Sequence, residues 1–383
     1  MQKKAAFAFI DEHRAEMISL WQTLVNRDSG TSDKAAINAL QFVIKKILEG
    51  MGAKVRLVEY GKAGSLLIGE IGSHDMEAPV IFSGHIDTVF KQGTAAERPF
   101  TIRDGKAYGP GVLDMKGGVV AFLYAIKALQ AAGYEKRPFK VLLAGDEENG
   151  HLYSNAAEIF QKEAAGAVAA FNCETGFIDD GIVVGRKGVA IFTMETFGIS
   201  AHVGNDPENG RSAIKEIAHK LLAVEELTDW AVGTSFNVGV IEGGTVTNAT
   251  PDYAKIKIDM RYLREEDRDK AVAGLKAIGA ENFVPGTKTE IINMVERFTP
   301  MVATEDNKKL FTLVQQQAEK LGIEMTARVG GASSDAGWTV RAGAPTLCGM
   351  GAIGEFNHTT REYIFVDSLV QRAKLLALSI DAL

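Results

Sequence analysis

Apolar residues recur in the first half of the chain with two alternating periods, one typical of helices and one typical of buried strands. The helical period covers residues 35–51 and 117–132, and the second of these segments is strongly apolar. This alternation predicts an α/β fold in which helices cover a largely buried sheet. The predicted strands are residues 54–59, 65–71, 80–83, 140–144 and 167–172.

The pattern changes after about Lys187, where two helices alternate with three strands. This order is typical of a compact two-layer α+β unit of the ferredoxin-like kind, inserted into the first domain. The sequence therefore predicts a discontinuous catalytic domain, residues 1–187 and 299–383, and an inserted domain, residues 188–298. The elements of the insertion are strands 189–197, 234–240 and 254–262 and helices 212–226 and 265–278, and helices 307–321 and 366–378 follow it.

The length and composition of the chain limit its domain number, its partners and its compartment. A chain of 383 residues is long enough for two domains. Its net charge of −7 speaks against a nucleic-acid or anionic-membrane partner. Residues 1–26 read as an amphipathic helix interrupted by charges, which is unlike a signal peptide or a membrane span. Two cysteines, Cys173 and Cys348, favour a reducing compartment, so we expect a cytoplasmic protein.

Polar side chains follow the predicted strands at their carboxyl ends. His85 and Asp87 come after strand 80–83, and Glu147 and Glu148 come after strand 140–144. Taken alone, a histidine in a turn is as often structural as functional, and acids beside Asn-Gly usually belong to a solvated loop. In open α/β sheets, however, ligands bind at this edge, so each of these residues is a site candidate.

Three further residues follow strands or glycine turns, namely Asp114, Glu174 and His358. An acid before a helix, such as Asp114, is most often an N-cap. Together with the other acids, it would place too much charge on one sheet edge to remain unneutralised. A pair of metal ions about 3.5 Å apart with a bridging carboxylate would resolve this and form a hydrolytic centre. Oxygen and nitrogen ligands without thiolate favour zinc, cobalt or manganese.

Nine short motifs, in order from about residue 10 to the C-terminus, resemble the co-catalytic zinc exopeptidases and deacylases. This family includes glutamate carboxypeptidase, acetylornithine deacetylase, succinyl-diaminopimelate desuccinylase and aminoacylase. The resemblance implies a three-layer catalytic domain with an inserted lid and dimerisation domain. The motifs are SGHIDTV, GPGVLDMKGG, GDEENG, CETG, ISAHVGNDPENGRSA, VTNATPD, DMRY, GGASSDAG and GEFNHTTREY.

The resemblance also implies a role for each residue of the predicted centre. His85 and Glu174 would hold one zinc ion, Glu148 and His358 would hold the other, and Asp114 would bridge the two. Cobalt or manganese could replace zinc. Glutamate rather than aspartate at position 174 resembles the carboxypeptidase and deacylase branches, because the aminopeptidase branch usually has aspartate.

Four acids would support the centre. Glu147 resembles the general base, which takes a proton from the water between the two ions and later gives it to the leaving nitrogen. Asp87 would orient His85, and Glu362 would be an outer partner of the metal ligands. Asp146 has no assigned role beyond support of the turn.

Residues of the inserted domain resemble substrate-binding positions. His202 alone would be read as a surface histidine, but in dimeric relatives the matching histidine reaches the partner's active site and stabilises the oxyanion. Asn248 and Arg261 match residues of the lid that help to bind substrate. The expected homodimer would form through this domain.

A second group would bind the free α-carboxylate of the substrate. Arg297 resembles the arginine that makes a bidentate pair with it, and Gly330 and Gly331 would supply backbone amides. Arg186 is a weaker candidate, because a basic residue before a strand of the lid is often solvated. The Ser333-Ser334 pair departs from the family pattern, so side-chain specificity at these positions cannot be transferred.

The sequence thus predicts a dinuclear zinc hydrolase that cleaves an amide or peptide bond of a small peptide or N-acyl amino acid. The branch that the chain resembles most is that of glutamate carboxypeptidase. The similarity lies in HIDTVF, in the basic residue and the later Pro-Phe that follow it, and in Gly-Pro-Gly before Asp114. An N-acyl amino acid deacylase is the alternative. A remote alternative is a binding protein without catalytic activity, because neither the metal ligands nor the base is missing from the sequence. Cys173, beside a ligand, is expected to be a small buried residue rather than a nucleophile.

Overall fold

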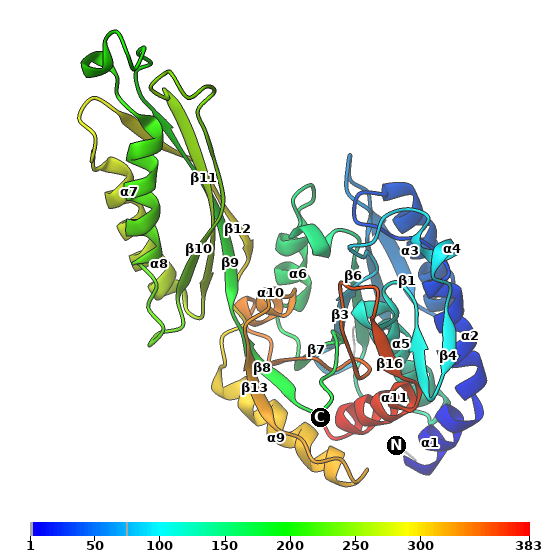
Figure 1. Cartoon of the computed structure of the whole chain (residues 1–383). Helices are drawn as coiled ribbons and strands as arrows, with labels where there is room; N and C mark the ends of the chain where they lie inside the picture. The colour runs from blue at the N-terminus through cyan, green and yellow to red at the C-terminus, as the bar shows by residue number, and fades with distance from the viewer. Residues whose placement is uncertain (1–2, 74–75) are drawn as a thin grey trace. The chain divides into compact units, whose positions relative to one another are not determined.

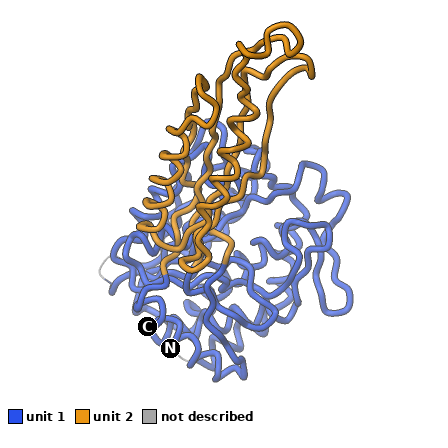
Figure 2. Tube along the Cα trace, turned by 60° about the vertical axis from the view of Figure 1, so that its left-hand side comes forward, with its two compact units in different colours: residues 1–185, 303–330, 334–383 blue, residues 186–302, 331–333 orange. Residues whose placement is uncertain are grey.

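The computed structural model describes residues 3–73 and 76–383, which fall into two compact units (Figures 1 and 2). Unit 1 comprises residues 1–185, 303–330 and 334–383, and unit 2 comprises residues 186–302 and 331–333. An eight-stranded sheet with the order β1-β2-β6-β3-β7-β14-β8-β13 forms the centre of unit 1. Its strands are β1 (Lys54–Val58), β2 (Leu66–Ile71), β3 (Val80–His85), β6 (Phe139–Ala144), β7 (Ala169–Asn172), β8 (Ile182–Arg186), β13 (Ala327–Gly330) and β14 (Thr346–Cys348).

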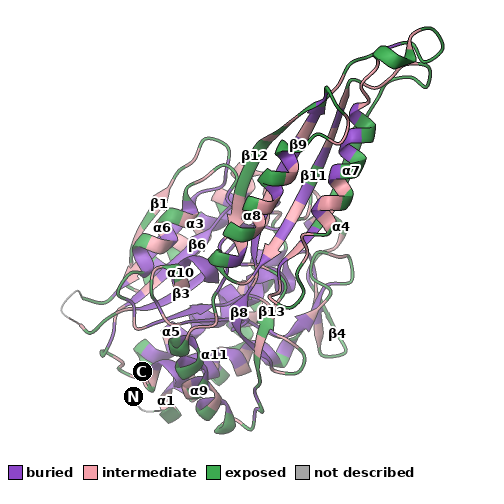
Figure 3. Ribbon diagram, turned by 90° about the vertical axis from the view of Figure 1, so that its left-hand side faces the viewer, coloured by how far each residue is buried: buried purple, intermediate pink, exposed green. Residues whose placement is uncertain are grey.

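The middle of this sheet is parallel and buried on both faces. Strands β6, β3, β7 and β14 run in the same direction, whereas β1, β2 and β8 pair antiparallel with their neighbours. Successive side chains point to opposite faces. Val80 and Phe82 of β3 therefore enter one hydrophobic core, and Ile81 between them enters another. Figure 3 shows the resulting burial of β3 and β6.

Helices contribute to both cores, which gives three layers. The larger core contains residues of most of the long helices, and the smaller core contains residues of two short ones. This architecture confirms the predicted α/β class. Among the described residues, no helix has the length and apolar character needed to span a membrane. The helices of the larger core are α1 (Lys3–Glu12), α2 (Arg14–Val25), α3 (Lys34–Gly50), α5 (Gly118–Ala131), α9 (Glu305–Glu319) and α11 (Val366–Asp381), and those of the smaller core are α6 (Ala156–Ala164) and α10 (Ala336–Arg341).

Unit 2 is a four-stranded antiparallel sheet with the order β10-β11-β9-β12. Its hydrophobic core joins the sheet to the helices α7 (Ala213–Glu225) and α8 (Glu265–Ala280). The strand and helix order along the chain, βαββαβ, matches the predicted ferredoxin-like insertion. The strands are β9 (Gly188–Phe197), β10 (Ser235–Gly243), β11 (Tyr253–Tyr262) and β12 (Lys288–Phe298).

Several elements differ from those predicted, among them α6, α10, β8, β13 and β14, which were not predicted. The N-terminal segment forms two helices that meet at His13, so that Ile10 and Met17 are both buried in the same core. Strand β12 was not predicted because it is an edge strand whose apolar side chains, such as Met294, are exposed among polar ones. A second small sheet of unit 1 was also missed, since its strands have only two or three residues. It consists of β4 (Thr101–Arg103), β5 (Lys106–Tyr108), β15 (Gly354–Glu355) and β16 (Tyr363–Phe365).

Truncation of Phe82 tests the importance of the central strand. Its fully buried ring stacks on Phe122, with 5.4 Å between ring centroids. We expect Phe82→Ala to lower the free energy of unfolding by about 3–5 kcal/mol, because the variant loses buried apolar surface and leaves a cavity. Phe42→Ala, at a half-exposed position on α3, should cost less than about 1 kcal/mol. Denaturant unfolding followed by circular dichroism measures both, and equal losses would contradict the packing described.

Candidate metal centre

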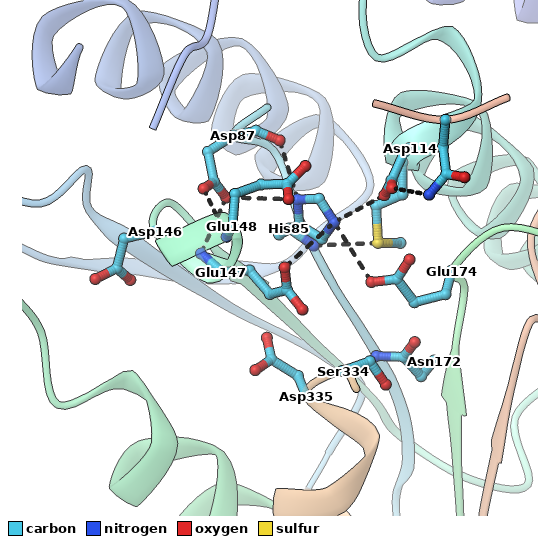
Figure 4. A network of polar contacts seen from close by, with 12 residues as sticks. His85, Asp87, Asp114, Asp146, Glu147, Glu148, Asn172, Glu174, Ser334 and Asp335 are labelled. Carbon is cyan, nitrogen blue, oxygen red and sulfur yellow. Dashed lines mark hydrogen bonds and ion pairs between the residues drawn. The ribbon is translucent and has the colours of Figure 1, made fainter. Parts of the chain in front are cut away.

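Strands β3, β6 and β7 place three of the predicted metal ligands and the predicted base at one edge of the sheet. His85 is the last residue of β3, Glu147 and Glu148 lie just beyond β6, and Glu174 lies just beyond β7. Since β3 pairs in parallel with both β6 and β7, these strand ends meet at the same edge. Figure 4 shows the four side chains pointing toward one another.

One ring nitrogen of His85 faces the carboxylates, and a hydrogen bond holds the other. Its Nε2 lies 3.2 Å from Asp114 Oδ1 and 3.4 Å from Glu174 Oε1. Its Nδ1 donates to the backbone oxygen of Asp87 at 3.0 Å and lies 3.4 Å from the Asp87 carboxylate. A histidine whose Nδ1 carries the proton leaves Nε2 free to bind a cation. Asp87 thus contacts the ring nitrogen of His85 that faces away from the ligand atoms.

Asp114 connects the two halves of the centre. It lies in the segment of residues 112–117 that precedes α5, where its own backbone is not helical (φ −110°, ψ 98°). Its Oδ1 faces His85, and its Oδ2 lies 3.2 Å from His358 Nε2. The same His358 nitrogen lies 3.2 Å from Glu148 Oε2. Two groups that share Asp114 each offer three ligand atoms within 4.8 Å of one another, His85-Asp114-Glu174 and Asp114-Glu148-His358.

The loop that carries Asp114 is held by Glu362. The buried Glu362 carboxylate accepts hydrogen bonds from the backbone amides of Gly111, Leu113 and Asp114 at 2.8–3.0 Å. Glu362 therefore supports Asp114 through the backbone of the loop that carries it. Asn357, which the sequence analysis did not single out, donates to Asp114 Oδ2 at 2.9 Å. Its position beside His358 in the same motif was the available signal.

The turn after β6 separates the two adjacent glutamates. Residues Glu147–Asn149 form one turn of 3-10 helix, which ends at Gly150 in the left-handed region with φ +66°. The Asp87 carboxylate accepts the backbone amides of Glu147 and Glu148 at 3.2 and 3.1 Å. Glu148 then reaches His358, whereas the nearest Glu147 oxygen lies 3.9 Å from His85 Nε2. Asp87 thus holds the turn as well as the histidine.

Burial of so many acids shifts their pKa values strongly. Burial raises the pKa of Glu147 well above its usual range, although His85 opposes this, and the nearby Glu174 adds to it. Burial also raises the pKa of Glu148 to about 7, against the hydrogen bond from His358. Hydrogen bonds to Asp114 and Glu148 raise the pKa of His358 to about 11. These shifts show that the cluster favours added positive charge, which divalent cations would supply in place of protons.

The donor set fits divalent cations such as zinc. It combines carboxylate oxygens with two imidazole nitrogens and contains no thiolate, because Cys173 is a free, buried residue with a raised pKa due to burial. Glu148 Oε1 is buried and has no hydrogen-bond partner among the described residues. A cation at the Asp114-Glu148-His358 group would satisfy such an atom.

A second buried cluster lies beside the turn and was missed in the sequence. His151 Nδ1 lies 3.0 Å from Asp146 Oδ1, and His151 Nε2 lies 2.6 Å from Asp335 Oδ1. Ser154 also donates to Asp146 Oδ1, at 2.9 Å. Asp146 therefore supports the turn, as expected, but it does so through residues that no motif identified.

The predicted lid residues lie in unit 2. His202 is exposed, and its backbone pairs with Ala249, next to Asn248. Arg261 on β11 is engaged by Asp259 in a bidentate pair at 2.6 and 2.9 Å. Arg297 is partly buried on β12.

The remaining substrate candidates lie at the end of β13 and the end of β8. Gly330 is the last residue of β13, and a Cβ atom on Gly331 would contact no atom within 4 Å. The buried Arg186 donates to the backbone oxygen of Ala332 at 3.3 Å, so it holds this loop rather than being solvated. Ser333 donates to the backbone oxygen of Lys187 at 2.7 Å.

The six residues of the predicted centre and base are thus brought together in unit 1. These residues are His85, Asp114, Glu147, Glu148, Glu174 and His358. His202, Asn248, Arg261, Arg297 and Gly331 belong to unit 2, and Gly330 is the last residue of its segment of unit 1. Ser334, next to these loops, is buried and lies 3.4 Å from the Cys348 sulfur, so it faces the interior.

Known proteins resemble this chain over most of its length. Carboxypeptidase G2 of Pseudomonas sp. (strain RS-16) is 30% identical over 97% of this chain and 89% of that protein. A succinyl-diaminopimelate desuccinylase of Sulfurovum sp. (strain NBC37-1) is 27% identical over 75% and 79% of the two chains. The crystal structure of aminopeptidase PepT from Bacillus cereus ATCC 10987 superposes with a TM-score of 0.82 at 25% identity, covering 96% of this chain and 98% of that one.

The family comparison agrees with the chemistry of the site. The description "Peptidase family M20/M25/M40" matches residues 81–382, a range that contains every residue of the candidate centre. The named relatives act as peptidases or as a desuccinylase, and all of these reactions break peptide or amide bonds. The chain therefore belongs to the peptidase family M20/M25/M40 and is a metal-dependent enzyme that acts on peptide or amide bonds.

Proposed function

We propose that this enzyme is a dinuclear zinc carboxypeptidase that releases a C-terminal amino acid, with a preference like that of glutamate carboxypeptidase. The observation that carries the proposal is the pair of ligand groups that share Asp114, with the buried Glu147 beside them. Two ions in these groups would activate a water molecule and polarise the substrate carbonyl. Cobalt or manganese would substitute for zinc, since all three accept nitrogen and oxygen ligands.

Glu147 is the proposed general base. Its carboxylate lies 3.9 Å from His85 Nε2, on the side of the ring that faces the ligand atoms, and it belongs to neither ligand group. Its raised pKa suits a carboxylate that takes a proton from the attacking water and then delivers it to the leaving nitrogen. Cations beside it would oppose this pKa shift and keep the resting carboxylate ionised. Adjacent glutamates therefore have separate tasks, Glu148 with the metal and Glu147 with the proton.

The substrate is proposed to be a small peptide or an N-acyl amino acid with a free α-carboxylate. Arg297 would make a bidentate pair with this carboxylate, and Gly330 and Gly331 would offer backbone amides. Asn248 and Arg261 would complete the binding residues, with Asp259 holding the Arg261 guanidinium in place.

An N-acyl amino acid deacylase is the second candidate. The desuccinylase relatives favour it, because they act on an amide bond with a different acyl group. Acetylornithine deacetylase and aminoacylase activities belong to the same alternative. The 30% identity to carboxypeptidase G2 over 97% of the chain supports the carboxypeptidase instead. The two buried free cysteines fit a reducing compartment, so we propose that the reaction takes place in the cytoplasm.

We also propose a homodimer through unit 2. Strand β10 is an edge of its sheet, and the exposed Ile241 on β10 and Leu222 on α7 are apolar. Edge strands and exposed apolar side chains are common features of subunit interfaces. In such a dimer, His202 would stabilise the oxyanion in the partner's active site.

Removal of metal tests the proposed chemistry. A chelator should abolish hydrolysis, and zinc or cobalt should restore it, because the ions would activate the attacking water and polarise the substrate carbonyl. A panel of acyl-glutamates, dipeptides, acetylornithine and succinyl-diaminopimelate, ranked by kcat/KM, then separates carboxypeptidase from deacylase. Activity that survives exhaustive metal stripping would contradict the proposal. An equal preference for acetylornithine would move it to the deacylase.

Substitution of the two glutamates separates base from ligand. We expect Glu147→Ala to lower kcat roughly 10²–10⁴-fold while zinc content stays at two ions per chain. Glu148→Ala should instead lose metal, because Glu148 is one of the three ligands of its group. The exposed Glu305→Ala serves as a control with unchanged kinetics. Loss of zinc in Glu147→Ala, measured by elemental analysis, would mean that the two roles are exchanged.

Mixing two inactive variants tests whether His202 acts in the partner's site. His202→Ala and Glu147→Ala should each be nearly inactive, but their mixed dimers would contain one complete site. After subunit exchange in an equal mixture, about a quarter of the wild-type activity should return. Absence of recovery, although mass spectrometry detects mixed dimers, would contradict action in trans.

A further inference from the structure

We propose that His151 is a positioning residue that clamps the glutamate turn to helix α10 by bridging Asp146 and Asp335. The glutamate turn means residues 145–150, which carry Glu147 and Glu148. This inference rests on the proposed function of those two glutamates, and it assigns a role to a residue outside the metal ligands and the base.

The bridge is short and buried at all three members. His151 Nδ1 lies 3.0 Å from Asp146 Oδ1, and Nε2 lies 2.6 Å from Asp335 Oδ1. The side chains of the three residues are only 1–3% exposed. Solvent therefore does not compete with these hydrogen bonds, and each carboxylate depends on the imidazole for charge compensation.

Both ring nitrogens must donate in this arrangement. An ionised carboxylate only accepts hydrogen bonds, so an imidazole between two carboxylates carries a proton on each nitrogen. Burial lowers the pKa of His151, but Asp335 and Asp146 outweigh this effect and raise it well above its usual range. The result is a charge-assisted bridge, which is stronger than a hydrogen bond between neutral groups.

The bridge joins two elements of unit 1 that are far apart in sequence. Asp146 immediately precedes Glu147, and Asp335 is the residue at the start of α10. Asp87 holds the backbone amides of Glu147 and Glu148 separately. The glutamate turn is therefore fastened by two independent contacts, one from the strand end of β3 and one from α10.

The backbone of His151 is arranged for this role. Its φ is +57°, a left-handed conformation that is uncommon for histidine. The chain reverses there, and the His151 amide donates to the Asp146 backbone oxygen at 3.1 Å. The conformation thus returns the imidazole over the residue that precedes the two glutamates, and such unusual backbone states are concentrated at functional sites.

Asp335 also belongs to the surroundings of the base. It faces Glu147 in Figure 4, and it is one of the charges that raise the Glu147 pKa. An Asp335 without its histidine could turn or repel the Glu147 carboxylate. We therefore assign to the clamp the task of holding Glu147 in a productive orientation, with a smaller effect on Glu148, which His358 also engages.

Kinetics of His151→Asn provide the first test. Asparagine tolerates a left-handed backbone but is too short to bridge two carboxylates, so the substitution removes the clamp and preserves the turn. We expect kcat to fall roughly 10–100-fold, with KM and zinc content unchanged, which is the usual effect of removing an outer hydrogen-bond partner. His219→Asn, on the exposed side of α7, is the matched control with unchanged kcat.

A double-mutant cycle distinguishes the clamp from general destabilisation. Asp335→Ala should lower kcat like His151→Asn, and the double variant should lose little more than either single variant, because all three remove the same bridge. A kcat within twofold of wild type for His151→Asn would overturn the proposal. Losses that multiply in the double variant would also overturn it, because the two residues would then act independently.

A spectroscopic measurement tests the bridge without any activity. In protein labelled with ¹⁵N-histidine, the number of rings with protons on both nitrogens at neutral pH should be one lower in His151→Asn than in the wild type. A His151 ring with a single protonated nitrogen would contradict the bridge. If the wild-type protein showed this additional ring but no metal-dependent hydrolysis, the proposed function would fail while the bridge would stand.

Discussion

The parallel pairing of β3 with β6 and β7 is the constraint on which the site depends. Because the three strands run in the same direction, the residues that follow them meet at one sheet edge. The pairing is secured by side chains that enter a separate core on each face, such as Phe82 on one and Ile81 on the other. The packing of the hydrophobic layers thus determines where the acids lie. It brings their side chains together in a small volume.

Burying several carboxylates together costs free energy unless their negative charge is compensated. Neighbouring backbone amides stabilise two of the surrounding acids. Glu362 collects three backbone amides of the loop that carries Asp114, and Asp87 collects two amides of the glutamate turn. Each of these acids accepts hydrogen bonds from backbone donors and belongs to neither ligand group. The ligand atoms, by contrast, face one another in two groups that share Asp114. An enzyme that uses metal ions needs this division between acids that hold the scaffold and acids that hold the ions.

Much of this arrangement could be predicted from the sequence, because it follows strand ends and short motifs. The α/β class, the ferredoxin-like insertion and the convergence of His85, Glu147, Glu148 and Glu174 follow from periodicity and parallel topology. Strand β12 could not be recognised, because an edge strand with exposed apolar residues lacks a clear alternation. His151 and Asp335 were missed for a different reason. Their contact joins residues 184 positions apart, and no local pattern reports such a pair.

The central claim is that Asp114 bridges two metal ions, one with His85 and Glu174 and the other with Glu148 and His358. The most direct measurement is anomalous diffraction at the zinc edge from crystals of the zinc-loaded enzyme. The account predicts two anomalous peaks, one on each side of the Asp114 carboxylate. A single peak, or peaks away from Asp114, would contradict it.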